Sequence, residues 1–163
     1  MTCATPTAAR TPTSTAGATA AEIDPNLADN TAIATTIVIA GAADLQEASV
    51  SASLTTVPIG GKLSVTDTAT NRGGSAAAKT TTRYYLSGDA ARDAGDLLLT
   101  GSRSVPALAA GASSTGTATV TVPNTAVPGT YFLLACADDG AVIPESNETN
   151  TCRAAGGVAQ VTP

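Results

Sequence analysis

Acidic side chains gather in two stretches that are rich in turn-forming residues, SGDAARDAGD and DDGAVIPESNETN. Carboxylate oxygens are the ligands that Ca²⁺ prefers, and irregular loops can supply the roughly six to eight oxygens it takes. The candidate calcium ligands are Asp89, Asp93, Asp96, Asp138, Asp139 and Glu145. Their spacing does not match an EF-hand loop. The alternative is that these side chains lock turns by accepting hydrogen bonds from nearby backbone N–H groups.

Catalytic chemistry finds little support in the residue types. The sequence contains no histidine, which removes the commonest general base and the commonest neutral-pH proton shuttle. Serine and threonine are abundant, but no basic group is placed to activate them, and the two lysines, Lys62 and Lys79, lie in unremarkable contexts. We therefore expect no enzymatic activity and no cofactor other than the Ca²⁺ considered above.

The two cysteines near the end of the chain suggest a cross-link. Cys136 ends the apolar run YFLLAC and Cys152 lies in NTCR, so a turn-rich loop separates two strand-like segments. This layout favours a cross-strand disulfide, with two buried free thiols as the alternative. A disulfide indicates an oxidising compartment, and hence an extracellular location. Cys3 would then be a free thiol, an intermolecular link, or a residue whose partner lies elsewhere.

The composition limits both the core and the partners. The chain of 163 residues has 34 Ala, 28 Thr and 15 Gly, against one Phe, three Tyr and no Trp, so its core must be thin and drawn from Val, Leu and Ile. The net charge is -5 and there is no basic run, which argues against nucleic acid or anionic membrane as partners. No apolar stretch is long enough to span a bilayer.

The elements that must position these residues are strands. Thr, Val and alternating polar and apolar residues dominate, and helical spacing is not sustained. The predicted strands span residues 45–54, 62–70, 80–86, 97–104, 115–122, 130–138 and 151–161. Seven short strands at this spacing predict an all-β, immunoglobulin-like sandwich of two sheets.

Two of these strands depart from simple alternation. Asp67 shares a face with apolar neighbours, so either a bulge shifts the register or a carboxylate points inward, where Arg83, Tyr84 or backbone N–H groups would be its partners. In YFLLAC both faces are apolar, with Phe132 and Leu134 on the second face. Only one face can meet the opposite sheet, so we expect something to cover the other.

Residues 1–40 form a separate segment. They suggest a strand, an Asp/Asn/Pro loop and a second strand that ends in an apolar run, and a lone hairpin of this kind is marginal in water. We expect this arm to add strands to a neighbouring copy. The residues predicted to take part in assembly are Ile33, Ile37, Val38, Ile39, Phe132, Leu134 and Cys3.

Two parts of the chain resemble known bacterial domains. Residues 44–161, including ADLQEASVSA, GGKLSVTDTATNRGGS and GTYFLLACADDGAVIPESNETNTCR, resemble the CARDB domain, the cell-adhesion-related domain found in bacteria. That resemblance implies an immunoglobulin-like seven-stranded sandwich at the cell surface, used for adhesion or assembly. Residues 4–39, with ATAAEIDPNLADNTAIATTIVI, resemble the C-terminal half of a conserved surface-protein repeat.

These observations predict an arm at residues 1–40 and a CARDB-like sandwich at residues 41–163. The leading hypothesis is a non-enzymatic, extracellular bacterial adhesion or structural module that forms a filament or oligomer by strand addition through the arm. Its partners would be other copies of itself or neighbouring surface modules. The alternative is a calcium-dependent spacer or ligand-binding module of a larger tandem-repeat adhesin.

Overall fold

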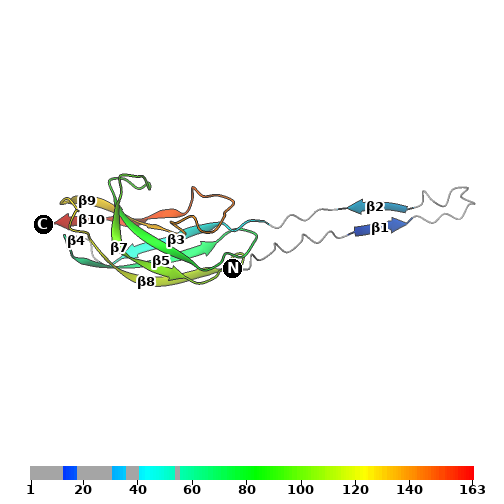
Figure 1. Cartoon of the computed structure of the whole chain (residues 1–163), viewed down its shortest axis with the longest axis horizontal. Coiled ribbons are helices and arrows are strands. Elements are labelled where there is room, and N and C mark those ends of the chain that lie inside the picture. The colour runs from blue at the N-terminus through cyan, green and yellow to red at the C-terminus, as the bar shows by residue number, and fades with distance from the viewer. Residues whose placement is uncertain (1–12, 18–30, 36–40, 54–55) are drawn as a thin grey trace, which may run out of the picture. The chain divides into compact units, whose positions relative to one another are not determined.

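The computed structural model describes residues 13–17, 31–35, 41–53 and 56–163. The chain divides into two compact units, Met1–Ala40 and Gly41–Pro163, and each is described by itself. All regular elements in the described residues are strands (Figure 1). The described residues contain no helix long and apolar enough to cross a membrane.

The first unit contributes two paired strands. β1 (Thr13–Gly17) and β2 (Thr31–Thr35) form an antiparallel two-stranded sheet in which Thr15 lies opposite Ile33. The other arm residues predicted to take part in assembly, Cys3 and the apolar run at residues 37–39, lie outside the described residues. Strand donation by this unit therefore stays a prediction.

The second unit is a single sheet of eight strands. They are β3 (Leu45–Ala52), β4 (Thr56–Pro58), β5 (Lys62–Asn71), β6 (Thr80–Ser87), β7 (Leu97–Val105), β8 (Ser113–Thr121), β9 (Gly129–Cys136) and β10 (Cys152–Thr162). Their order is β3-β5-β8-β7-β6-β9-β10-β4, and every pair is antiparallel except β10 with β4. Each of the seven predicted ranges overlaps one strand. The additional strand, β4, is only three residues long and ends in a proline, so it carries no alternation to detect.

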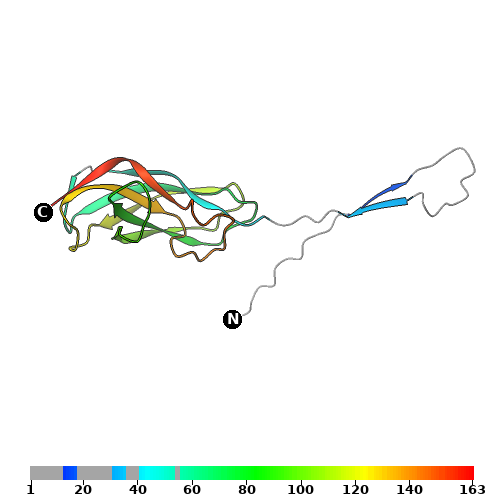
Figure 2. The same ribbon diagram turned by 90° about the horizontal axis from the view of Figure 1, so that it is seen from above.

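The sheet curls instead of separating into the two sheets that the sequence predicted. β7 and β8 are joined by one pair, Thr100 with Thr121, and part beyond it. At the opposite side, the chain leaves β3 beside β5 and then continues as β4 beside β10. In Figures 1 and 2 the strands run along the long direction of this unit. β3, β5 and β8 consequently form one layer and the remaining strands form the other.

The core between the layers is built mainly from medium-sized side chains, as the composition predicts. Leu63, Val65, Leu99 and Val120 are fully buried, and Tyr84 is the largest fully buried side chain. Burying one such side chain contributes roughly 1.5–3 kcal/mol. The alternation of buried and exposed residues along β5 and β8 places this core on one face of each strand.

The outer face of β5 and β8 is a row of hydroxyl groups. Three cross-strand pairs follow one another: Thr66 Oγ1 with Thr117 Oγ1 at 2.8 Å, Thr68 Oγ1 with Thr115 Oγ1 at 2.9 Å, and Thr70 Oγ1 with Ser113 Oγ at 2.8 Å. β-branched side chains suit a pleated surface, and paired hydroxyls add to strand pairing. This outer face, here called the hydroxyl face, therefore carries paired hydroxyl groups from Thr66 to Thr70 of β5, and its charged residue is the exposed Lys62 at the start of β5.

Candidate functional site

The predicted disulfide is present. Cys136 and Cys152 lie directly opposite each other on β9 and β10 and are bonded, with a Cα–Cα distance of 4.0 Å. The bond closes a loop with a sequence separation of 16 residues. A cross-link of about this span removes conformational freedom from the unfolded chain and stabilises the fold by about 3 kcal/mol. The bond also fixes both ends of the loop that carries the second acidic group.

The second apolar face of β9 is covered by the chain itself. Leu134 is fully buried beside Tyr85, its cross-strand partner on β6, and Phe132 is partly buried in the same cluster. The guanidinium of Arg92, from the loop between β6 and β7, lies 3.8 Å from the centre of the Tyr85 ring. The Tyr85 hydroxyl donates to Asp139 Oδ2 at 2.7 Å. Phe132 is thus the more accessible of the two β9 residues predicted to take part in assembly.

Asp67 points inward, and its main partner is one that the sequence did not indicate. Its side chain is fully buried and accepts a hydrogen bond from the Tyr84 hydroxyl at 2.6 Å, as predicted. Arg103 Nε donates to both carboxylate oxygens, at 2.9 and 2.8 Å, and Arg103 Nη2 donates to Oδ2. The predicted partner Arg83 is exposed and instead lies 3.5 Å from Asp139.

Arg103 reaches Asp67 because β7 and β8 part beyond Thr100. Its side chain passes over Gly116 on β8, where a Cβ atom would lie only 2.7 Å from Arg103 Cδ. Arg103 Nη1 and Nη2 also donate to the hydroxyl and the carbonyl of Ser114, each at 3.3 Å. The glycine therefore makes room for the ion pair that joins the two layers.

A second carboxyl group completes this buried polar cluster. Glu47 on β3 is 4% exposed, and its Oε1 accepts a hydrogen bond from Thr82 Oγ1 at 2.9 Å. Its Oε2 has no hydrogen-bond partner. Burial, followed by the nearby charge of Asp67, raises the pKa of Glu47 to about 8. Glu47 is consequently mostly protonated at neutral pH, so the cluster avoids two adjacent buried negative charges.

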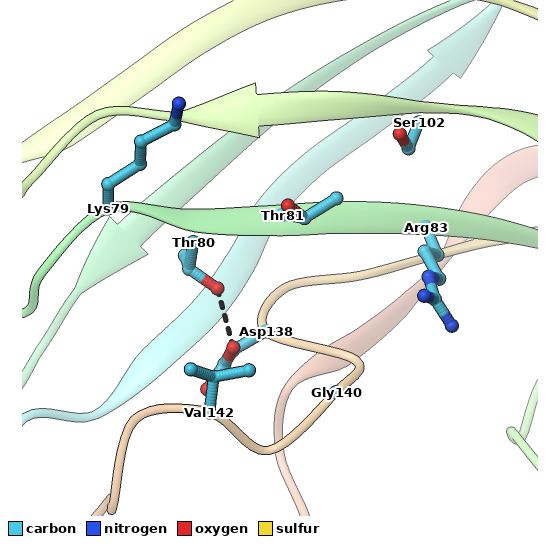
Figure 3. Close-up of a pocket in the computed structure, with 8 residues that line it drawn as sticks. All are labelled: Lys79, Thr80, Thr81, Arg83, Ser102, Asp138, Gly140 and Val142. Carbon is cyan, nitrogen blue, oxygen red and sulfur yellow. Dashed lines mark hydrogen bonds between the residues drawn. The ribbon is translucent and has the colours of Figure 1, made fainter.

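A cleft of about 500 Å³ lies beside the start of β6 (Figure 3). Its lining residues are Lys79, Thr80, Thr81, Arg83, Ser102, Asp138, Gly140 and Val142. Both carboxylate oxygens of Asp138 accept hydrogen bonds from the protein. Oδ1 accepts from Thr80 Oγ1 at 2.5 Å, and Oδ2 accepts from Ile143 N at 2.7 Å. The Asp138 carboxylate is therefore occupied by protein groups, and Lys79, Thr81 and Ser102 are further polar groups in the lining.

The first acidic loop uses its carboxylates as turn locks. Asp89 Oδ1 accepts from Ala91 N at 2.8 Å, and Asp93 Oδ1 accepts from Gly95 N at 2.7 Å. Asp96 Oδ2 accepts from the backbone N of Asp93 at 2.9 Å. These hydrogen bonds agree with the alternative to a calcium site, in which the acidic side chains lock turns. Among the described residues, no group of three or more acidic, cysteine or histidine side chains is arranged to hold a metal ion.

The second acidic loop docks on β3. Glu145 Oε2 accepts a hydrogen bond from the backbone N of Leu45, and Ser146 N donates to Ala43 O at 2.8 Å. Burial raises the pKa of Glu145 to about 7. Asn150 Nδ2 donates to Asp44 Oδ1 at 2.9 Å. Two buried oxygens of this group, Glu145 Oε1 and Asn150 Oδ1, have no partner.

Comparison with known proteins agrees with this architecture. A CARDB family profile matches residues 42–155. The CARDB domain of a Pyrococcus furiosus protein, solved in complex with di-metal ions, is 20% identical, with 74% of this chain and 90% of that chain covered and a TM-score of 0.50. A domain of a Methanosarcina acetivorans protein classed as a cell surface protein is 16% identical, with 74% and 93% covered and a TM-score of 0.50. No curated protein shows significant similarity to the chain.

These comparisons address the second unit. The two solved structures share its fold, at identities too low to indicate more than the fold. The resemblance of residues 4–39 to a surface-protein repeat stays a prediction. Because the matched segment makes up more than half of the sequence, the chain belongs to the CARDB family.

Proposed function

We propose that this protein is a non-enzymatic structural or adhesion module of the bacterial cell surface that assembles with other modules by β-strand pairing. The observation that carries the proposal is the two-stranded β1–β2 sheet, a separate compact unit. Two strands alone are marginally stable in water and gain from pairing with a further strand. Ile33 on β2 and the apolar residues at 37–39 that follow it in the sequence would form the donated strand.

The extracellular location is supported by two independent features. The Cys136–Cys152 disulfide would persist in an oxidising compartment and is uncommon in the cytosol. A structural neighbour of similar fold is a domain of a protein classed as a cell surface protein. In this setting the second unit acts as a compact sandwich, and the arm of residues 1–40 links it to a neighbouring copy.

Removal of the arm tests this function. Multi-angle light scattering of the full chain over a concentration series should give masses above the 15.8 kDa of one chain. A variant lacking residues 1–40 should lose the arm-dependent part of that assembly, and its circular dichroism should still show a folded β protein. Unchanged assembly after the deletion would contradict strand donation by the arm.

A second candidate function is a calcium-dependent spacer. A CARDB domain of similar fold was solved with di-metal ions, and here two unpartnered oxygens, of Glu145 and Asn150, lie in the loop that docks on β3. Titration calorimetry with Ca²⁺, and melting with and without a chelator, would measure binding. Glu145→Gln should weaken binding at this loop, whereas Asp93→Asn serves as the matched change in the first loop. An absence of heat and of any melting shift would exclude this candidate.

A further inference from the structure

The edges of the sheet in residues 41–163 are protected to different degrees. An unpaired strand edge can template pairing with another chain, and proteins usually block it with charges, prolines, bulges or covering segments. β3 has a bulge between Glu47 and Ser49, and the loop after β9 covers its start through Glu145 and Ser146. β4 is three residues long and ends in Pro58. Both of these edges are therefore poor templates.

The edge of β8 that faces away from β5 lacks such protection. Only Thr121 pairs with β7 in the described part of the sheet, and Gly101 of β7 still lies against the Thr119 carbonyl oxygen, so the residues of β8 before Thr119 form the open part of this edge. The pairing with β5 is continuous over nine residue pairs and has no bulge. β8, with the sequence SSTGTATVT, contains no charged residue and no proline.

The backbone groups exposed along this edge can be identified from the register. Ser64 O accepts from Ser53 N, so the backbone of Ser64 points toward β3 and away from β8. Thr119 is the residue opposite Ser64, and in an antiparallel pair its N–H and C=O must then also point away from β5. Because the backbone direction alternates with every residue and so repeats every two, Thr115 and Thr117 present their N–H and C=O to the same free edge as Thr119.

We infer that this edge is an interface in which β8 pairs antiparallel with β8 of a second copy, about a twofold axis at Gly116. In this register Thr115 of one copy lies opposite Thr117 of the other, and each such pair exchanges two backbone hydrogen bonds. The inference rests on the proposed assembly function but needs no residue of the arm.

The side chains of β8 suit this self-pairing. On the outer face, Thr115 would meet Thr117 of the second copy and repeat the hydroxyl contact that Thr117 already makes with Thr66 at 2.8 Å. On the inner face, Gly116 and Ala118 are small, so two copies can approach without displacing Arg103, which lies over Gly116. No charge on β8 opposes the contact, although each chain carries a net charge of -5. The interface would be isologous, with one patch used twice.

A proline on the free edge tests the interface in the full chain. Thr117→Pro removes an N–H that does not bond β5, so the fold should tolerate it as edge strands tolerate proline. Sedimentation velocity should show a dimer for the unmodified chain and at least a tenfold weaker dimer for the variant. Thr117→Lys provides a second disruption if the proline variant fails to fold, and Thr66→Lys, on the same face of the central strand β5, is the matched control. Equal dimerisation of Thr117→Pro, Thr117→Lys and the unmodified chain would overturn the inference.

Site-specific cross-linking distinguishes pairing of β8 with β8 of a second copy from pairing of β8 with the arm. In a Cys3→Ser background, an equimolar mixture of Thr115→Cys and Thr117→Cys chains should cross-link with a short bifunctional maleimide at least several-fold more than either variant alone. A mixture of Thr117→Cys and Ile33→Cys chains should cross-link less. Preferential cross-linking to Ile33→Cys would overturn β8 self-pairing while supporting strand donation by the arm. Unchanged assembly on deleting residues 1–40, with the β8 cross-link retained, would count against the arm alone.

Discussion

The two sides of the curled sheet close in opposite ways. On the β3 side, the loop after β9 supplies a carboxylate and backbone groups to the strand, and β4 continues the sheet beside β10. On the β8 side, the contact between layers is made inside the core by Arg103 and Asp67, and the backbone edge above it is left unpaired. The curled sheet therefore joins its two layers with a buried ion pair and keeps one strand edge available.

The largest effect should come from breaking the ion pair on the β8 side. Asp67→Asn leaves the buried guanidinium of Arg103 without a negative partner, which should lower the free energy of unfolding by about 3–5 kcal/mol. Urea denaturation followed by circular dichroism would measure the loss. Asp93→Asn, which alters an exposed turn lock, is the control and should cost about 1 kcal/mol or less. Similar losses for the two variants would contradict the role given to Arg103.

Filling the space over which Arg103 passes should have the next largest effect. Gly116→Val places side-chain atoms where Arg103 Cδ lies, which should cost about 1–3 kcal/mol of unfolding free energy. Ala118→Val, two residues along the same inner face, is a comparison that does not meet the guanidinium. If Gly116→Val is as stable as the unmodified chain, the Arg103 side chain does not pass over Gly116 as described.

The β3 side should respond to removal of its capping carboxylate by a smaller amount. Glu145→Ala takes away the acceptor for the Leu45 N–H, and loss of one such hydrogen bond should cost about 1 kcal/mol. Glu145→Gln keeps an oxygen at the same place and should recover most of the loss. Hydrogen exchange at Leu45 should speed up in the alanine variant and not in the glutamine variant.

The stability of the fold should depend on pH through Glu47, which lies on β3 and belongs to the buried cluster of Asp67 and Arg103. Its pKa is raised from the ordinary value of 4.5 to about 8 in the folded state, so the folded chain binds this proton more tightly than the unfolded chain. The stabilisation by protonated Glu47 is complete below about pH 4.5 and is lost as the pH rises toward 8. Glu145, whose pKa is raised to about 7, changes stability in the same direction.

Glu47→Gln tests whether Glu47 causes the pH dependence of stability. The amide stays neutral at every pH, so the fall in melting temperature between pH 5 and pH 8 should become smaller than in the unmodified chain. Glu148→Gln, in the exposed loop, is the control. An unchanged slope in Glu47→Gln would show that Glu47 does not hold its proton in the folded state.

On the β8 side, the strands and the inward position of Asp67 could be predicted from the local sequence. The partners Arg103 and Glu47 of the buried cluster could not. The alternation of Thr with Val and Ala predicts β5 and β8, and the position of Asp67 among apolar neighbours indicates an inward carboxylate with Tyr84 as a partner. Arg103 and Glu47 were missed because their roles depend on how β7 and β3 cross the other layer. Their own strands show no local sign of it, since long polar side chains are usually exposed.

The loops differ in the same way. The cysteine pair was predictable because both residues end or begin strand-like segments, and the structure confirms it. The docking of Glu145 on β3 joins residues 100 positions apart, which no local pattern indicates. A glycine opposite a buried carboxylate, as with Gly116 and Asp67, is the one sequence signal that could have suggested the crossing of Arg103, and only with the register in hand.

We propose that this CARDB protein assembles through paired β-strands. Light scattering of the full chain, from low to high concentration, is the most direct test of this proposal. The mass should rise with concentration from that of one chain to at least that of two. A mass of one chain at every concentration would contradict it.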